Sequence, residues 1–301
     1  MTEQLTLIEG RQVKLTNLDK LLWPEGYTKA HLIKYYLDMA PYILPHIHNR
    51  PVVMKRYPNG ITGEYFYQKE CPDYAPEWIK THPVEHSEKT INYIVCNDSA
   101  TLAWLANNAC IEIHTWISDD GERNYEHPDI AIIDLDPPDG YSFHVTLELA
   151  LLVRKALEEF NLVCFPKTSG SRGLHLFIPI KKFYTWQSVT ASMKFIAELV
   201  VSACPEKATV ERKVNERKGK VYIDYLQNGR GKTMVAPYSL RALPGAPVST
   251  PLLWREVEKG DFQPEDFNKR TISPRFKKYG DTFQEIINIR QSIDQILKII
   301  E

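Results

Sequence analysis

The chain lacks the marks of a secreted or membrane-spanning protein. Its five cysteines, spread over 301 residues, form no C-x-x-C pair, which argues against a disulfide framework and against a structural zinc site. No apolar run is long enough to cross a bilayer, and no signal-peptide pattern is present. We therefore expect a cytoplasmic protein with reduced, buried thiols and without a membrane partner.

An excess of charge of one sign is also missing. There are 37 Lys and Arg against 38 Asp and Glu, so the total charge gives no sign of a nucleic-acid partner. The local balance differs, because the segment 207–232 holds eight Lys or Arg and three acids. This strip favours contact with nucleic acid, although a solvated hairpin with ordinary lysines is the alternative.

The first half of the chain predicts an N-terminal α/β part over about residues 11–125. Residues 1–10 are expected to be a loose polar lead-in. Thr28 is expected to begin a helix that Pro41 and Pro45 close, and Asp98 or Ser99 to begin a second helix. Short strands are predicted at 51–57, 64–69 and 111–116.

The second half predicts a regular α+β core over about residues 126–240. Strands are predicted at 130–135, 162–165, 174–180 and 220–226, and helices at 142–160 and 186–204. This is the order of a ferredoxin-like or RRM-like unit, in which one face of the sheet carries both helices and the other face is free for a site. A C-terminal segment, about 241–301, is expected to pack on the body and to end in a helix over 283–300. We expect all three parts to form a single domain, 1–301.

Two acids in the first strand of this core are expected to point to the same face. Asp134 and Asp136 alternate with Ile133 and Leu135, because successive side chains of a strand point to opposite sides. Asp224 lies in a strand that the ferredoxin-like order places in the same sheet. Close carboxylates repel each other unless a cation lies between them, and oxygen ligands suit magnesium or manganese. The alternative, a solvated strand end before a turn, is disfavoured because the strand is otherwise apolar.

A glycine-rich turn lies between two of the predicted strands. Residues 167–175, K-T-S-G-S-R-G-L-H, combine glycines, hydroxyls, exposed amide donors, Arg172 and His175, which suits the binding of a triphosphate. The turn is not a P-loop, since G-x-x-x-x-G-K-[ST] is absent, and a plain hairpin connection is the alternative. A metal cluster beside an anion-binding turn favours in-line phosphoryl transfer.

Together these blocks resemble the polymerase domain of bacterial ligase D, which serves non-homologous end joining and belongs to the archaeo-eukaryotic primase superfamily. The resemblance runs in order through L-T-N-L-D-K (15–20), T-K (28–29), R-P (50–51), K-R-Y-P-N-G (55–60), D-S-A-T (98–101), I-D-L-D-P (133–137), T-S-G-S-R-G-L-H (168–175), Y-I-D-Y-L-Q-N (222–228) and A-P-Y-S-L-R (236–241). It implies an archaeo-eukaryotic primase-like fold, with an RRM/ferredoxin-like catalytic core sheet and an N-terminal α/β subdomain.

The resemblance also implies roles for individual residues. Catalysis and the binding of two divalent metal ions, Mn²⁺ in preference or Mg²⁺, fall to Asp134, Asp136 and Asp224. Nucleotide contacts fall to Ser169, Ser171, Arg172, His175, His114, Phe66, Tyr67, Arg217, Gln227 and Arg241, of which Phe66 and Tyr67 would stack on bases. Asn17, Lys20 and Lys29 are implied to bind the 5′-phosphate of a downstream DNA strand. Other DNA contacts are implied for Lys55, Arg56, Arg230 and Lys232. Arg172 stands where many relatives carry Lys, and it keeps the positive charge while adding a planar fork.

The implied activity is nucleotidyl transfer, in which a primer 3′-hydroxyl attacks the α-phosphorus of an NTP or dNTP, with ribonucleotides preferred. The implied DNA has a gap or a 3′ overhang and a downstream 5′-phosphate. Ku protein and a separate ATP-dependent DNA ligase are the implied partners at the bacterial or archaeal nucleoid, because the ligase motif K-x-D-G is absent here and the chain is expected to act as a free-standing polymerase.

Two other functions would use the same residues or the same fold. A metal-dependent nuclease or phosphodiesterase would use the three carboxylates to activate water, but the triphosphate turn argues against it. A non-catalytic RRM-like nucleic-acid-binding module would carry RNP1-type aromatics on its sheet, and the sequence contains no such block.

Overall fold

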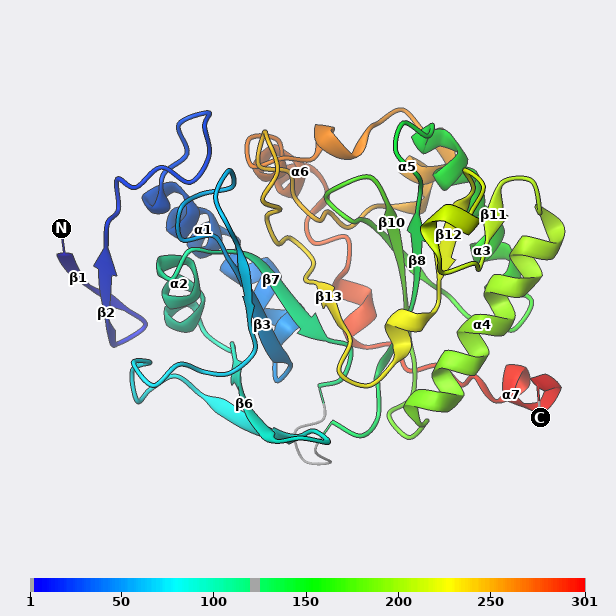
Figure 1. Cartoon of the computed structure of the whole chain (residues 1–301), viewed down its shortest axis with the longest axis horizontal. Helices are drawn as coiled ribbons and strands as arrows, with labels where there is room; N and C mark the ends of the chain where they lie inside the picture. Colours follow the sequence, from blue (N-terminus) through cyan, green and yellow to red (C-terminus); the bar gives the residue numbers. More distant parts are fainter. Residues whose placement is uncertain (1–2, 120–124, 301) are drawn as a thin grey trace.

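Two β-sheets face each other in the middle of the protein, and helices cover the outer side of each (Figure 1). The computed structural model describes residues 3–119 and 125–300. The strands are β1 (Glu3–Ile8), β2 (Arg11–Thr16), β3 (Pro51–Arg56), β4 (Phe66–Gln68), β5 (Thr81–Glu85), β6 (Thr90–Val95), β7 (Cys110–Trp116), β8 (Ile130–Asp136), β9 (Phe165–Thr168), β10 (Leu174–Pro179), β11 (Ala208–Thr209), β12 (Val221–Asp224) and β13 (Thr233–Val235). The helices are α1 (Lys29–Ile47), α2 (Ser99–Asn107), α3 (Phe143–Glu158), α4 (Trp186–Ala203), α5 (Trp254–Lys259), α6 (Ile272–Tyr279) and α7 (Asp294–Ile300), with short 3₁₀ helices η2 (Val214–Glu216), η3 (Leu226–Asn228), η4 (Pro264–Asp266) and η5 (Gln284–Ile287). None of the helices in the described ranges combines the length and the apolar character needed to span a membrane.

The sheet that we call the core sheet has the strand order β11-β12-β8-β10-β9. Its antiparallel strands β12-β8-β10-β9 follow the ferredoxin-like order, and β11 extends the edge in parallel with β12. Ile133, Leu135 and Leu176 point to the side covered by α3 and α4, whereas Ile132 and Phe177 point to the other sheet. The expected α+β core, with its helices on one face, is confirmed.

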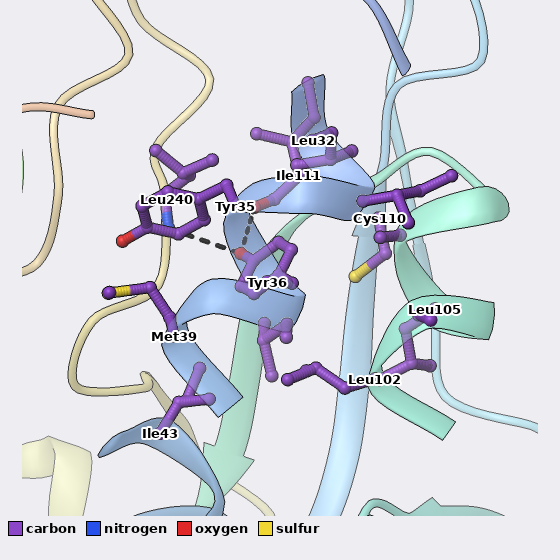
Figure 2. Close-up of a cluster of buried hydrophobic side chains, with 14 of the residues drawn as sticks. Leu32, Tyr35, Tyr36, Met39, Ile43, Leu102, Leu105, Cys110, Ile111 and Leu240 are labelled. Atoms are coloured by element: carbon purple, nitrogen blue, oxygen red, sulfur yellow. Dashed lines mark hydrogen bonds between the residues drawn. The ribbon is translucent and has the colours of Figure 1, made fainter. Parts of the chain in front are cut away.

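The second sheet, which we call the N-terminal sheet, has the order β13-β7-β3-β6-β5, with β4 attached to β3. Helices α1 and α2 pack on its outer side. Figure 2 shows Tyr36 of α1 pointing into this core beside Leu102 and Ile111. The Tyr36 hydroxyl donates to the Ile111 carbonyl over 2.6 Å and accepts from the Leu240 amide over 3.2 Å. The core therefore anchors the backbone just before Arg241, a predicted site residue.

Helix α1 begins where the sequence predicts and ends later. Thr28 precedes it in a capping box with His31, which confirms the predicted start. The prediction that Pro41 and Pro45 close the helix is wrong, because both lie inside it. An interior proline costs about 3 kcal/mol. Each fully buried isoleucine stabilises by about 1.5–3 kcal/mol, and the helix buries Ile43 and Ile47 completely.

The expected loose lead-in at the N-terminus is also wrong where the structure describes it. Residues 3–8 form β1, which pairs with β2 along its whole length from Glu3 opposite Thr16 to Ile8 opposite Arg11. Residues 1–2 lie outside the described range. The strand was hard to foresee because its apolar side chains Leu5 and Leu7 are exposed and make no core pattern.

The single C-terminal helix predicted over 283–300 is wrong, because the structure has η5 and α7 with an extended link between them. Phe283 and Ile286 pack between the two sheets, whereas Ile293 and Ile296 pack on the helical side of the core sheet. The Gln291 side chain bonds to two backbone carbonyls beside the core sheet and holds the link extended. One straight helix could not reach both apolar clusters. Residue 301 lies outside the described range.

The strand predicted at 162–165 is shifted in the structure to β9, Phe165–Thr168. Its register pairs Phe165 with Phe177 and Lys167 with His175 across β10. Lys167 and Thr168 therefore belong to a buried strand and not to the turn. Strands β5, β6 and β13 and helix α6 were not predicted, and the division into three parts stays a prediction.

Candidate active site

Four polar side chains form one row across four strands of the core sheet. The pairing places Lys167 of β9 opposite His175 of β10, His175 opposite Asp134 of β8, and Asp134 opposite Asp224 of β12. Residues directly opposite each other in antiparallel strands point to the same face. The row lies on the face that turns toward the N-terminal sheet. We call these four residues the polar row.

The three acids predicted as metal ligands meet on this face. Burial, followed by the charges of Asp224 and Asp136, raises the pKa of Asp134 to about 8. Asp136 accepts a hydrogen bond from Arg217 Nη1 at 3.1 Å, and Asp224 accepts one from Gln227 Nε2 at 2.9 Å. The geometry thus brings together five residues predicted for the site.

In this structure Asp136 and Asp224 accept hydrogen bonds from protein side chains, and the question is whether the acids can also bind a metal ion. Within residues 3–119 and 125–300, no group of three or more His, Cys, Asp or Glu side chains has the geometry of a metal site. The donor set nevertheless fits a divalent cation, because three oxygen ligands share one face and the repulsion around Asp134 would be relieved by a positive ion. Metal ligation by these three acids stays a prediction.

The turn between β9 and β10 is compact. A Cβ on Gly170 would lie 2.6 Å from Arg241 Cγ, and one on Gly173 would lie 2.5 Å from the Leu135 carbonyl oxygen, so both positions require glycine. Ser169 Oγ accepts hydrogen bonds from the amides of Ser171 and Gly173 over 3.1 and 3.0 Å. Two of the amides that the sequence suggested as free anion donors are therefore already used within the turn.

The side chains of the turn separate into two groups. His175, which belongs to the polar row, and Ser169 are 5% and 7% exposed, whereas Arg172 is exposed and forms an ion pair with Asp139. Ser171 is half-buried between them. His175 is thus placed beside the carboxylates, while Arg172 would have to turn away from Asp139 to contact a nucleotide.

Lys167 lies at the buried end of the polar row and is 0% exposed. Its Nζ lies 2.9 Å from His175 Nδ1 and donates to Ser249 Oγ over 2.5 Å. Burial, and then the charge of Arg241, lowers the pKa of Lys167 well below its usual value. His175 Nε2 lies 3.5 Å from Asp134 Oδ1 on its other side. Lys167 therefore orients the histidine next to the carboxylates, a role that the sequence reasoning missed.

A second cluster reaches the site from the N-terminal sheet. Glu112 and His114 of β7 lie together with Lys55 of β3, Tyr67 of β4 and Arg241. Arg241 Nη1 donates a hydrogen bond to the Ser169 carbonyl and so links the two sheets at the turn. Four of these five residues were predicted as nucleotide or DNA contacts. Glu112 was not, although its place two residues before His114 in an apolar strand is the pattern that identified Asp134.

The two aromatic residues predicted to stack on bases point in opposite directions. They are consecutive in β4 and about half exposed, so the strand sends them to opposite sides. The Tyr67 ring lies 5.8 Å from that of His114, whereas the Phe66 ring lies 5.2 Å from the Arg56 guanidinium. Tyr67 faces the cluster around Glu112, and Phe66 lies beside Arg56, which borders a separate cavity.

That cavity has a volume of about 220 Å³ and is bordered by all three residues predicted to bind a 5′-phosphate. Its lining includes Asn17, Lys20, Lys29, Arg56, Asn107 and Asn108. Lys29 Nζ donates to the Asn107 carbonyl over 3.0 Å, and Lys20 Nζ to Asn59 Oδ1 over 3.1 Å. Burial, and then the charges of Lys20 and Arg56, lowers the pKa of Lys29 to about 8. Three cations around one small cavity suit an anion.

The remaining predicted DNA contacts lie elsewhere. Arg230 donates to the Glu85 carbonyl and forms an ion pair of 2.9 Å with Glu126, which ties it to the N-terminal sheet. Lys232 is exposed and lies just before β13. Within the basic strip 207–232, Lys207 pairs with Glu148 and Lys213 with Glu216. The contact of this strip with nucleic acid stays a prediction.

Comparison with known proteins finds one family across most of the chain. Residues 28–283 match the family described as LigD, primase-polymerase domain. The multifunctional non-homologous end joining protein LigD of Mycolicibacterium smegmatis is 35% identical over 274 residues, which are 90% of this chain and 35% of that protein. The bifunctional LigD of Bacillus subtilis is 35% identical over 90% of this chain and 44% of its own length. The chain thus spans less than half the length of these curated relatives.

A solved structure agrees with these matches. The polymerase domain from Mycobacterium tuberculosis Ligase D, solved in complex with DNA, superposes with a TM-score of 0.86 and 33% sequence identity, covering 93% of this chain and 99% of that one.

Proposed function

The chain belongs to the family of LigD primase-polymerase domains and is a polymerase-type nucleotidyltransferase, and from this we propose that it adds nucleotides, preferably ribonucleotides, to a DNA 3′-hydroxyl at gaps or broken ends. The observation that carries the proposal is the polar row. It places Asp134 and Asp224 beside His175 at the foot of the Ser169 turn, so acids for metal ions and donors for phosphates share one face.

Asp134, Asp136 and Asp224 would hold two divalent ions, with Mn²⁺ preferred over Mg²⁺. When bound, these ions would activate the attacking hydroxyl and neutralise the leaving pyrophosphate. The contribution of the protein is to keep the three carboxylates on one face and to release them from their present donors. Arg217 would leave Asp136, and Gln227 would leave Asp224, when the acids turn to the ions.

The nucleoside triphosphate would lie between the Ser169 turn and the cluster around Glu112. Ser169, Ser171 and His175 offer hydrogen-bond donors, and Arg172 and Arg241 offer positive charge, for its phosphates. Tyr67, with about half of its surface exposed beside His114, offers a flat apolar face to the base. Because the two sheets meet at Arg241 and Ser169, the substrate would contact both halves of the protein.

The cavity around Lys29 would bind the 5′-phosphate of the DNA strand downstream of the gap. None of the residues that line this cavity belongs to the polar row, which provides separate places for the broken end and for the reaction. Recognition of the 5′-phosphate would select gaps and ends over intact duplex. Ku protein and an ATP-dependent DNA ligase are the partners that such a reaction needs to bring ends together and to seal them.

A primer-extension assay tests the proposal. Gapped duplexes that differ only in a 5′-phosphate or 5′-hydroxyl downstream are incubated with Mn²⁺ or Mg²⁺ and with NTPs or dNTPs. We expect addition of one or a few ribonucleotides, strongest with Mn²⁺ and the 5′-phosphate, and loss of addition in Asp134→Asn. Asp129→Asn is the matched control, since Asp129 is a buried carboxylate paired with Arg50 outside the row.

Two results would contradict the proposal in different ways. Shortening of the primer without extension would indicate a nuclease that uses the same acids. Extension that ignores the 5′-phosphate would leave a polymerase but remove the end-joining role.

A further inference from the structure

A buried carboxylate lies at the centre of the cluster on the N-terminal sheet. The Glu112 side chain is 2% exposed. Lys55 Nζ, the Tyr57 hydroxyl and the Ala242 amide donate to Oε1 over 3.2, 3.4 and 3.2 Å. His114 Nε2 and Arg241 Nε lie 3.0 and 3.1 Å from Oε2. One carboxylate is thus the shared partner of five polar groups.

The charge of Glu112 is kept by these neighbours. Burial alone would raise the pKa of Glu112, but the hydrogen bond from His114 and the charges of Arg241 and Lys55 lower it to about 2. Burial also lowers the pKa of His114, so the imidazole is neutral at pH 7 and carries one proton. Because a carboxylate accepts and does not donate, that proton lies on Nε2, and Nδ1 keeps its lone pair.

Packing does not explain an acid at this position. Glu112 lies on the opposite face of β7 from the fully buried Ile111 and Ile113, and an apolar side chain there would avoid the cost of removing a charge from water. The donors around Glu112 also have further contacts. Arg241 reaches on to the Ser169 carbonyl, the His114 ring meets Tyr67, and Lys55 Nζ lies 4.4 Å from the centre of the Tyr65 ring. Arg241 and His114 also lie close enough to His175 of the polar row to lower its pKa.

We propose that Glu112 is a positioning residue for the nucleotide. It fixes Arg241 beside the Ser169 turn and Lys55 beside Tyr65, and it keeps the His114 proton on Nε2, so that Nδ1 can accept a hydrogen bond from the nucleotide. Ordering these side chains before the substrate arrives reduces the entropy lost on binding. The inference rests on the proposed polymerase function, because it assigns the cluster to that substrate.

Steady-state kinetics of nucleotide addition test the inference with Glu112→Gln. The amide keeps the size of the side chain but offers one acceptor and turns an NH₂ group toward the donors. We expect the KM for the nucleotide to rise at least about tenfold, as for the loss of a charged hydrogen bond, with a much smaller change in kcat. Asp129→Asn removes a buried carboxylate that Arg50 holds with bonds of 2.7 and 2.6 Å and should leave the KM unchanged.

The outcomes separate this inference from the proposed function. A wild-type protein that fails to extend primers would contradict the function itself. An active wild type with an unchanged KM in Glu112→Gln, or an equal rise in KM in Asp129→Asn, would overturn the role of Glu112 and leave the function standing.

The tautomer of His114 gives a test that does not depend on the Glu112→Gln variant. Nitrogen NMR of the wild-type protein, with the His114 signals assigned by their loss in His114→Gln, should show a protonated Nε2 and an unprotonated Nδ1 at neutral pH. A proton on Nδ1 would contradict the proposal whatever the kinetics show.

Discussion

Arg217 Nη1 donates a hydrogen bond to Asp136 Oδ2 over 3.1 Å, so a cationic side chain occupies one of the carboxylates assigned to metal binding. The guanidinium is held there by two further bonds, to the backbone carbonyls of Glu211 and Arg212, and lies 4.1 Å from the centre of the Tyr222 ring. A metal ion at Asp136 therefore competes with an arginine from the same edge of the core sheet.

Arg217→Met should lower the concentration of Mn²⁺ needed for half-maximal primer extension. A partly exposed ion pair contributes about 0.2–1 kcal/mol, so the expected change is about 1.4- to fivefold. Lys213→Met is the control. Lys213 lies in the same segment, but it forms its ion pair with Glu216 and not with one of the three carboxylates assigned to metal binding. Titration of Mn²⁺ at saturating nucleotide measures the effect, and an unchanged or higher requirement would show that Arg217 does not compete with the metal.

Asp134 should make the metal-free protein less stable as the pH rises. Its pKa is raised by burial and by Asp224 and Asp136 from 3.8 to about 8, so the folded protein holds this proton more tightly than the unfolded chain. The penalty for its charge is absent at low pH and grows between about pH 4 and pH 8. In the presence of chelator, the Tm of Asp134→Asn relative to that of the wild type should therefore increase between pH 5 and pH 8.5.

Addition of Mn²⁺ at pH 8.5 should raise the Tm of the wild type and have little effect on Asp134→Asn. Thermal unfolding with and without the ion checks both statements. A variant whose Tm responds to Mn²⁺ as the wild type does would place the metal elsewhere.

Lys29 should make recognition of the 5′-phosphate depend on pH. Burial, Lys20 and Arg56 lower its pKa to about 8, so its positive charge is present below that pH and lost above it. The ratio of affinities for 5′-phosphorylated and 5′-hydroxyl DNA should fall above pH 8, with a limiting slope of about tenfold per pH unit. Fluorescence anisotropy at pH 7 to 9 measures this ratio. Lys29→Arg should keep it at pH 9, and a flat profile in the wild type would exclude Lys29 as the titrating contact.

Gly170 should be far less replaceable than another glycine with the same backbone conformation. Gly170 and Gly140 have φ of 71° and 72°, but a Cβ on Gly170 would lie 2.6 Å from Arg241 Cγ and 2.9 Å from the Ser249 amide, whereas Gly140 has open space around it. Gly140→Ala should cost about 1 kcal/mol from the backbone alone, and Gly170→Ala at least about 1–3 kcal/mol more from crowding. Denaturant unfolding measures the loss in free energy of unfolding for both variants. Equal losses would mean that the Ser169 turn can rearrange around the added methyl group at no cost.

The sequence predicted the acids of the candidate site better than the residues that hold the site's side chains in place. Asp134 and Asp136 could be assigned to one face because strand side chains alternate, and Asp224 followed from the ferredoxin-like order. Lys167 was missed, since a single buried charge gives no pattern until its partners are known. Glu112 was missed although it alternates with apolar residues as Asp134 does. The predicted end of helix α1 at Pro41 and Pro45 was wrong for the opposite reason. The prolines are a strong local signal for a helix end, but the burial of Ile43 and Ile47 outweighs it.

The sequence by itself determined the family, the α+β order of the core and the residues able to carry a phosphoryl-transfer reaction, because these depend on residue type and local period. Only the tertiary structure decided which of them meet. Register across four strands aligned Lys167, His175, Asp134 and Asp224, and the contact between two sheets brought Glu112 and Arg241 to the Ser169 turn. Those relationships join residues far apart along the chain, so they depend on how the sheets pair and pack and not on any local pattern.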